Sequence, residues 1–254
     1  MMRFFTRIFS LLLFLSPALF SQSQTAELWR KAIDILAANL DWVPGSMTMQ
    51  FELLDKNGEA DMVNTSTYKI YLDENGEVQS ELVRMINDGE DVTEKEKAKA
   101  EAKEEEKEKE NDDAKEQGED SEEGNVGFSM AESPFHPENQ GKIQLKPLDQ
   151  EKTVDGQVCR GFDYSLPLEE NTRIGTAWLN VETGAPVLHE FSTDPLPPRV
   201  KEMKNIVRYH YTPAGDFYTT EAMFEGVGGF LFIKKRFRGT MTFEDYWKHE
   251  KAQN

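Results

Sequence analysis

The stretch RIGTAWLNVETGAPVLHEFS, Arg173 to Ser192, decides the fold. It reads as two extended segments around Thr183-Gly184, which predicts two antiparallel strands joined by a turn that needs a positive φ. Neither face of the first strand is cleanly polar, and Trp178 stands in its middle. The hairpin therefore covers an ordinary core or forms the wall of a hollow that holds an apolar guest.

Similar strands are predicted on both sides of this hairpin. In SMTMQFELL, residues 46–54, apolar and polar side chains alternate as in a half-buried strand, and Asn57-Gly58 beyond it is a strong hairpin signal. About ten such strands follow one another with short connections, and LPPRVKEMK, residues 196–204, predicts one short helix. Turns between strands are predicted at Gly156, Gly184, Gly215 and Gly228-Gly229.

One long helix is predicted ahead of the strands. TAELWRKAIDILAANLD, residues 25–41, places an apolar stripe along one side at helical spacing, and VPGS after it ends the helix. The elements together predict a mainly β fold of the α+β class. We expect a strongly curved antiparallel sheet, or an unclosed β-barrel of about ten strands, covered by the N-terminal amphipathic helix.

Large apolar side chains occupy the faces that we expect to point inward. Such side chains build ordinary cores, but linings of methionine and aromatic residues also form adaptable apolar pockets. The candidates for lining an apolar cavity are Trp29, Ile33, Leu36, Met47, Met49, Phe51, Leu53, Tyr68, Ile70, Phe162, Tyr164, Trp178, Phe191, Met223 and Phe230.

The beginning of the chain has the pattern of a signal peptide. Two arginines precede an apolar run from Ile8 to Phe20, and small residues follow at Ser21 and Ser23. An uncleaved anchor and a buried helix are the alternatives. We expect residues 1–23 to be removed and residues 24–254 to form a single domain exported to the periplasm. The only cysteine, Cys159, rules out an intrachain disulfide.

Most of the negative charge lies in one segment. The whole chain carries a formal charge of −18, and residues 88–123 alone hold 18 acidic residues and 7 lysines. We interpret residues 88–126 as an acidic low-complexity insertion, a solvated spacer that is helical in part. Diffuse Ca²⁺ binding and recruitment of a basic protein partner are the alternatives. Such acidity argues against binding nucleic acid and against attraction to anionic membranes.

No catalytic pattern is present in the sequence. The histidines His136, His189, His210 and His249 form no metal-ligand spacing, and no nucleophile elbow, phosphate loop or dinucleotide fingerprint occurs. The basic stretch KKRFRG, residues 234–239, is interpreted as a solvated strand face. We therefore expect a protein that is not an enzyme and that uses no cofactor or metal.

The hairpin resembles one found in LolA-like outer-membrane lipoprotein-sorting proteins. The residues similar to that hairpin are Ala177, Trp178, Leu179, Asn180, Thr183, Gly184 and Pro186. The resemblance loosely covers residues 25–88 and 141–243, and it implies an unclosed barrel whose concave face, covered by helices, holds acyl chains. It also implies a carrier in envelope lipoprotein or lipid transport.

Two functions follow as hypotheses from these observations. The first is a monomeric periplasmic carrier that holds lipids or lipidated proteins without covalent bonds and without stable membrane insertion. The second is a non-carrying envelope sensor or interaction module on the same fold, in which the acidic residues 88–123 contact a basic partner.

Overall fold

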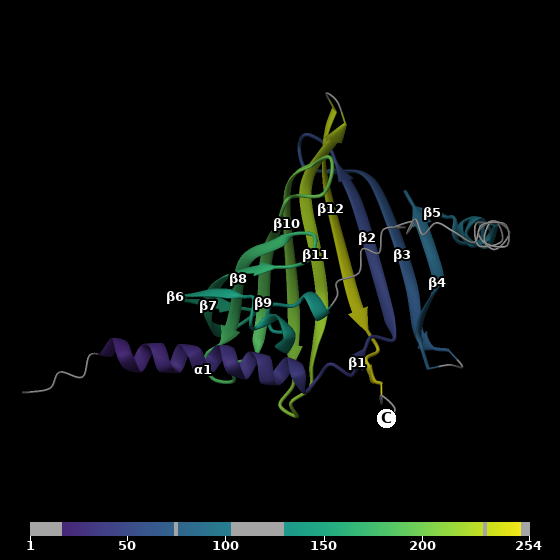
Figure 1. The fold of residues 1–254 in the computed structure, drawn as a ribbon. Coiled ribbons are helices and arrows are strands. Elements are labelled where there is room, and N and C mark those ends of the chain that lie inside the picture. Colours follow the sequence, from purple (N-terminus) through teal and green to yellow (C-terminus); the bar gives the residue numbers. More distant parts are fainter. Residues whose placement is uncertain (1–16, 74–75, 103–129, 231–232, 250–254) are drawn as a thin grey trace, which may run out of the picture.

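One antiparallel sheet dominates the computed structural model, which describes residues 17–73, 76–102, 130–230 and 233–249 (Figure 1). In these residues its eleven strands follow the order β5-β4-β3-β2-β12-β11-β10-β9-β8-β7-β6, so the edges β5 and β6 do not meet and the sheet is not closed. The predicted mainly β fold is confirmed. The strands are β1 Trp42–Val43, β2 Ser46–Leu54, β3 Ala60–Leu72, β4 Val78–Asn87, β5 Glu90–Asp91, β6 Gln144–Val154, β7 Gln157–Pro167, β8 Thr172–Asn180, β9 Pro186–Asp194, β10 Val200–Tyr211, β11 Phe217–Phe230, β12 Ile233–Glu244 and β13 Trp247–Lys248.

The long helix α1, Pro17–Ala37, lies across one end of this sheet (Figure 1). It packs through Trp29, Ala32 and Leu36, which lie along one stripe of the helix and are buried. It begins before the predicted start at Thr25 and so contains the predicted cleavage site, while most of the predicted signal peptide, residues 1–16, lies outside the described residues. Among the described helices, none combines the length and apolar character needed to span a membrane.

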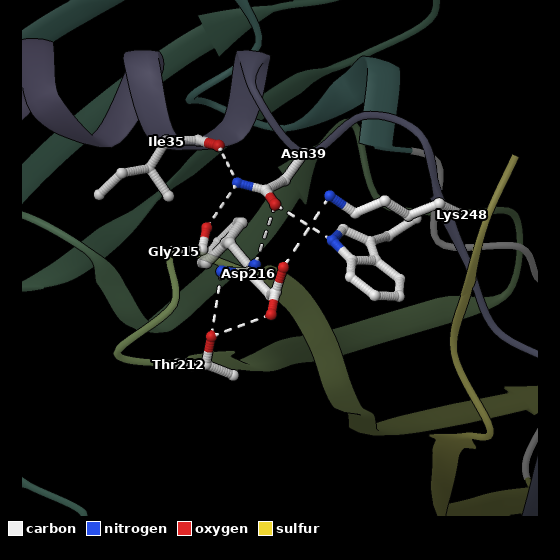
Figure 2. A network of polar contacts seen from close by, with 8 residues as sticks. Ile35, Asn39, Thr212, Gly215, Asp216 and Lys248 are labelled. Atoms are coloured by element: carbon white, nitrogen blue, oxygen red, sulfur yellow. Dashed lines mark hydrogen bonds and ion pairs between the residues drawn. The ribbon is translucent and has the colours of Figure 1, made fainter. Parts of the chain in front are cut away.

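A network of hydrogen bonds around Asn39 fixes the end of α1 to the sheet (Figure 2). The Asn39 amide nitrogen donates to the carbonyl oxygens of Ile35 at 2.8 Å and Gly215 at 3.1 Å. Its amide oxygen accepts from Trp42 Nε1 at 3.1 Å and from the backbone N–H of Phe217 at 3.2 Å. One buried side chain therefore joins the last turn of α1 to the β10–β11 turn and to β1.

Strands β10 and β11 differ from the prediction. Residues 200–204, expected in a short helix, begin β10, so that prediction is wrong. Residues Gly228-Gly229, expected to form a turn, continue β11, which pairs with β12 as far as Phe230. At Gly226 a Cβ would lie 2.3 Å from the carbonyl oxygen of Glu202, so this glycine allows close approach of β10 and β11. At Gly228 the nearest atom to a Cβ, in the Phe237 ring, lies 3.4 Å away, which is ordinary contact.

The β8–β9 turn confirms the role predicted for Gly184 and adds a contact with α1. Gly184 has a φ of +78°, and a Cβ there would lie 2.6 Å from Lys31 Cβ. Gly156 has the same φ of +78°, but nothing lies within 4 Å of its Cβ position. The two glycines therefore share one backbone conformation and differ in their surroundings.

This difference predicts the outcome of a matched pair of substitutions. We expect Gly156→Ala to lower the free energy of unfolding by about 1 kcal/mol, the cost of a positive φ with a Cβ. Gly184→Ala should cost about 2–3 kcal/mol, because it also displaces α1. Urea unfolding of both variants measures the difference. Equal losses would mean that the turn and α1 are not in contact.

The first residues of the acidic segment belong to the folded part. Glu90–Asp91 form β5, which pairs with β4, and a helix follows over residues 93–102. The side chain of Thr93 is buried and its hydroxyl accepts from the backbone N–H of Met85 at 2.9 Å. The spacer interpretation therefore concerns residues beyond 102, and residues 103–129 lie outside the described part of the chain.

Candidate functional site

The face of the sheet that contacts α1, here called the helix face, carries the larger apolar cluster. Trp29 of α1 lies over Phe162 of β7, with ring centroids 5.3 Å apart. The buried members of the cluster are Trp29, Ala32, Leu36, Phe135, Phe162, Tyr164, Leu166, Ala177, Leu179, Phe191, Val207, Tyr209, Phe217, Ala222 and Met241. The opposite side is called the outer face.

The segment of residues 130–143, here called the strap, covers part of the helix face beside α1. It contains the short helices η1, Met130–Glu132, and η2, Pro137–Asn139. Its Phe135 is fully buried, with its ring centroid 5.0 Å from that of Trp29. Trp29 Nε1 donates to Gln140 Oε1 at 3.0 Å, so α1 and the strap hold each other. The space beneath them is occupied by side chains of the protein itself.

Two charged groups fasten the strap to β8. Arg173 is 8% exposed, and it donates through Nη1 to the Glu132 carbonyl oxygen at 3.0 Å and through Nη2 to the Glu132 carboxylate. Its guanidinium also lies 4.8 Å from the ring centroid of Phe191. Because a buried charge needs a partner, Arg173 and Glu132 stabilise the packing of the strap against β8.

A polar cluster lies within the buried part of the helix face. His189 is fully buried, and its ring nitrogens make hydrogen bonds with the hydroxyl of Tyr164 and, at 3.5 Å, with that of Tyr209. Burial lowers the pKa of His189 to about 3, and the positive charge of Arg173 adds to this effect. Burial also raises the pKa values of both tyrosines. The cluster is therefore neutral at ordinary pH.

The lowered pKa of His189 predicts an effect of pH on stability. An unfolded histidine binds a proton below about pH 6.5, whereas folded His189 binds one only near pH 3. The contribution of His189 to the free energy of unfolding is fully present above about pH 6.5. It decreases as the pH falls, by up to about 1.4 kcal/mol per pH unit. We expect His189→Gln, which keeps a donor and an acceptor, to lose less stability than wild type between pH 7 and pH 4.5. Urea unfolding at both pH values measures this, and identical losses would contradict it.

Beyond the strap, the helix face continues as an aromatic surface on β2, β11 and β12. Phe51, Phe224 and Phe237, here called the aromatic triad, are partly exposed. Their ring centroids lie 6.2 to 6.5 Å apart. Leu53 and Met62 pair beside them in the sheet. Among the described helices, none lies over this part of the sheet in Figure 1, and the partly exposed triad presents apolar surface that a ligand could contact.

The structure brings together most of the predicted lining residues. Trp29, Leu36, Phe162, Tyr164 and Phe191 belong to the buried cluster. Ile33, Met47 and Met49 pack against that cluster. Phe51 and Leu53 lie on its open continuation, and Tyr68 and Ile70 lie on β3. The side chain of Phe230 lies outside the described part of the structure.

Trp178 and Met223 lie on the outer face, so their predicted place on the inward face is wrong. Trp178 lies between Ala177 and Leu179, which both belong to the helix-face cluster, and side chains of a strand alternate. It is buried in a second cluster with Cys159 and Leu188, and the ammonium of Lys152 lies 4.9 Å from its ring centroid. The sequence did not show which way Trp178 points, because both faces of β8 carry apolar residues.

A bulge explains the position of Met223. In the pairing of β10 with β11, Tyr209 lies opposite Thr219 and Arg208 lies opposite Glu221, so Thr220 is the extra residue. Phe217 before the bulge and Ala222 after it both face α1. The bulge therefore moves Met223 to the outer face.

Several residues of the site were not among the predicted candidates. Phe237 had a usable signal, because alternate positions of β12 are apolar or glycine from Phe237 to Phe243. Phe224 lies on β11, where the bulge at Thr220 shifts the alternation. Phe135 and Arg173 had none, since neither a proline-rich loop nor a single strand arginine indicates what it will contact. Their roles depend on residues distant in sequence.

Three cavities that described residues line lie elsewhere. One of about 690 Å³ lies by β4, β5 and the helix over residues 93–102, and its lining includes Arg84, Asp91 and Glu94. One of about 310 Å³ lies between α1 and β7 and is lined mainly by polar and charged residues, including Lys31 and Arg160. A third, of about 100 Å³, lies by Asn39 and Tyr246 and is smaller than usual ligand pockets. None of the three is lined by a predicted candidate, so the triad surface is the better candidate site.

Comparison with known proteins gives structural similarities at low sequence identity. A domain from Vibrio parahaemolyticus, described as an outer membrane lipoprotein-sorting protein, is 11% identical, with a TM-score of 0.36; 89% of this chain and 95% of that one are covered. A DUF1329 family protein from Desulfovibrio piger is 9% identical, with a TM-score of 0.36 and coverage of 91% and 95%. MucB of Pseudomonas aeruginosa, solved in complex with MucA, is 7% identical, with a TM-score of 0.23 and coverage of 89% and 99%.

The first of these descriptions agrees with the resemblance noted in the sequence. No family model and no curated protein matches the chain. No ligand or partner of this protein is inferred from these similarities.

Proposed function

We propose that this protein is an exported binding protein that holds an acyl chain, of a lipid or a lipidated protein, on the helix face. The observation that carries the proposal is the aromatic triad, because it extends a well-packed apolar core as a partly exposed surface. A contiguous group of exposed apolar side chains on a folded domain often marks a binding site, whereas single exposed apolar residues do not. The signal-peptide pattern of residues 1–23 supports export.

The contact surface suits a chain better than a compact molecule. The triad spans three neighbouring strands and is flanked by Leu53 and Met62, so an extended apolar group can lie across β2, β11 and β12. Each methylene removed from water contributes about 0.8 kcal/mol. Several methylenes would hold the ligand without a covalent step and allow its release.

Substitutions in the triad test this site. We expect Phe51→Ser and Phe237→Ser each to weaken binding of a fluorescent fatty-acyl probe about tenfold, because each removes apolar contact worth about 1.4 kcal/mol. Ile174→Ser, which changes a residue 51% exposed on β8 outside the triad, is the control and should change the affinity less than twofold. Fluorescence titration measures the affinities, and thermal melting checks that the variants fold.

Two results would contradict the proposed site. One is an unchanged probe affinity in both folded triad variants. The other is a wild-type protein that takes up no probe and shows no co-purified lipid or lipoprotein by native mass spectrometry after purification from the periplasm.

A second candidate function is a non-carrying interaction module. It is favoured by the filled space beneath α1 and the strap, where Phe135 and Phe162 take the place that a carried chain would need. In this function the acidic residues 88–123 contact a basic protein. Pull-downs with the whole chain and with a deletion of residues 103–123, which keeps β5 and the helix over residues 93–102, test it. Identical partners would remove the acidic segment from consideration.

A further inference from the structure

Three polar side chains interrupt the apolar helix face beside the aromatic triad. The strand register places them there, because Asn64 of β3 pairs with Phe51 of the triad and Asn87 of β4 pairs with Asn64. Ser66, two positions further along β3, pairs with Met49. Since the side chains of paired residues lie on the same face, all three share the face of Phe51 and Met49. We call Asn64, Ser66 and Asn87 the polar patch.

The polar patch and the triad lie close enough together to contact one ligand. Directly paired side chains have Cβ atoms about 4.5–5.5 Å apart, and diagonal neighbours lie about 7–8 Å apart. On the other side of Phe51, Gly239 lies between Phe51 and Phe224 in the sheet. A Cβ at Gly239 would overlap the Phe224 ring, so this ring lies over the backbone of β12. An apolar path therefore runs from the patch across Phe51 to Phe224.

The polar patch lacks hydrogen-bond partners of its own. Ser66 is 5% exposed, and its hydroxyl makes no hydrogen bond with any residue that the structure describes. Asn87 Oδ1 is buried and has no partner in the described part of the chain, and the same holds for the Asn64 amide, which is partly exposed. Buried polar groups are nearly always hydrogen-bonded, so the missing partners point to a ligand. Asn205, on β10, differs because it donates to the Phe191 carbonyl oxygen at 3.4 Å.

The charges near the patch disfavour an anionic ligand head. Glu90 pairs with Asn87 on the side away from β3, so a carboxylate lies on the same face as the patch. Two cations in this region have carboxylate partners of their own, Arg84 with Asp91 at 3.3 Å and Lys235 with Asp61 at 3.0 Å. Amide and hydroxyl groups suit uncharged ligand atoms, because they donate to a carbonyl and accept from an O–H or N–H.

We propose that the polar patch binds the head of an uncharged acyl ligand in which a carbonyl lies next to a hydroxyl or amide donor. The Asn64 amide donates to the ligand carbonyl, and the oxygens of Ser66 and Asn87 accept from the ligand donor. Rotation about the Cβ–Cγ bond of Asn87, a torsion with broad preferences, brings its oxygen to the head. The acyl chain then crosses Phe51 toward Phe224. This inference rests on the proposed function and names its ligand class, which is neutral acyl esters and amides rather than fatty acids or anionic phospholipids.

Four ligands with the same palmitoyl chain test the proposal on the whole exported chain, by displacement of the fluorescent fatty-acyl probe. We expect monopalmitoylglycerol and palmitoylglycinamide to bind about tenfold more tightly than methyl palmitate, which has the carbonyl but no donor. Palmitate should bind at least about tenfold more weakly than monopalmitoylglycerol, because its carboxylate meets Glu90 and offers no donor. A preference for only one of the two donor ligands would support the proposal and identify the source as an acylglycerol or an acyl amide.

Substitutions locate the head on the polar patch. Asn87→Leu should reduce the preference for monopalmitoylglycerol over methyl palmitate from about tenfold to less than about twofold, and Ser66→Ala should reduce it to about threefold. Asn205→Leu is the matched control, because it is the same change on the other side of the triad at a residue that has a partner. It should leave the preference unchanged. Both ligands carry the same chain, so damage to the apolar surface lowers both affinities and not their ratio.

Several results would overturn the proposal. They are equal binding of the two esters by wild type, a full preference retained in folded Asn87→Leu, and equal losses of preference in Asn87→Leu and Asn205→Leu. If methyl palmitate still binds in these cases and Phe51→Ser weakens it, the proposed function stands and only the role of the polar patch is wrong. If none of the four ligands binds, both are wrong.

Discussion

Replacing Phe135 by alanine is expected to lower the free energy of unfolding by about 3–5 kcal/mol. The side chain is fully buried in the strap, against Trp29 at a centroid distance of 5.0 Å and against Tyr209 at 6.3 Å. Truncation leaves a cavity beneath α1, since the strands on the other side are held by the sheet and cannot close it. Urea unfolding measures the loss.

The control for this prediction is Phe237→Ala, which removes the same atoms from a partly exposed position. It should cost about 1–2 kcal/mol, because less buried surface is lost. If the strap detaches as a unit, hydrogen exchange in residues 130–143 will increase while the sheet stays protected. Equal losses of stability in the two variants, with unchanged exchange in the strap, would show that Phe135 does not hold it.

Replacing Asn39 by leucine should lower the free energy of unfolding by about 3 kcal/mol. The substitution keeps the volume but leaves the Gly215 carbonyl, the backbone N–H of Phe217 and the indole N–H of Trp42 without their partner, in buried or partly buried positions. Each unsatisfied buried group costs about 1–3 kcal/mol, and partial access of water reduces the sum. Thermal and urea unfolding measure this effect.

Asn205→Leu is the matched control for Asn39. The Asn205 side chain makes one long hydrogen bond, at 3.4 Å to the Phe191 carbonyl oxygen, and it is partly exposed. Loss of this hydrogen bond should lower the free energy of unfolding by less than about 1 kcal/mol. A similar cost for the two asparagines would mean that the network in Figure 2 does not join α1 to the sheet.

The sheet and its covering helix were predictable because their signals are local. Alternation in β2 and the apolar stripe of α1 each arise from one element meeting a single apolar layer. The turns at Gly156, Gly184 and Gly215 were predictable for the same reason, since all three have a positive φ. The turn predicted at Gly228-Gly229 was wrong because β11 stays paired with β12 through both glycines as far as Phe230, and a local signal does not show where strand pairing ends.

The candidate site was predictable only in part. The alternation of apolar and polar residues along a strand shows which residues share a face. It does not show which face meets α1 when both faces are apolar, as around Trp178. A bulge also exchanges the faces of all residues beyond it, and the bulge at Thr220 places Met223 on the outer face. Phe224, two positions beyond Ala222, belongs to the helix face for the same reason.

The sequence by itself determined the kind of elements, their order and the uneven distribution of charge. These properties depend on backbone preferences and on neighbours within a few positions along the chain. Only the tertiary structure decided that Phe135 fills the space beneath α1 and that Arg173 holds the strap. Each of these contacts joins residues far apart in sequence, and the register of an eleven-stranded sheet decides which of them become neighbours.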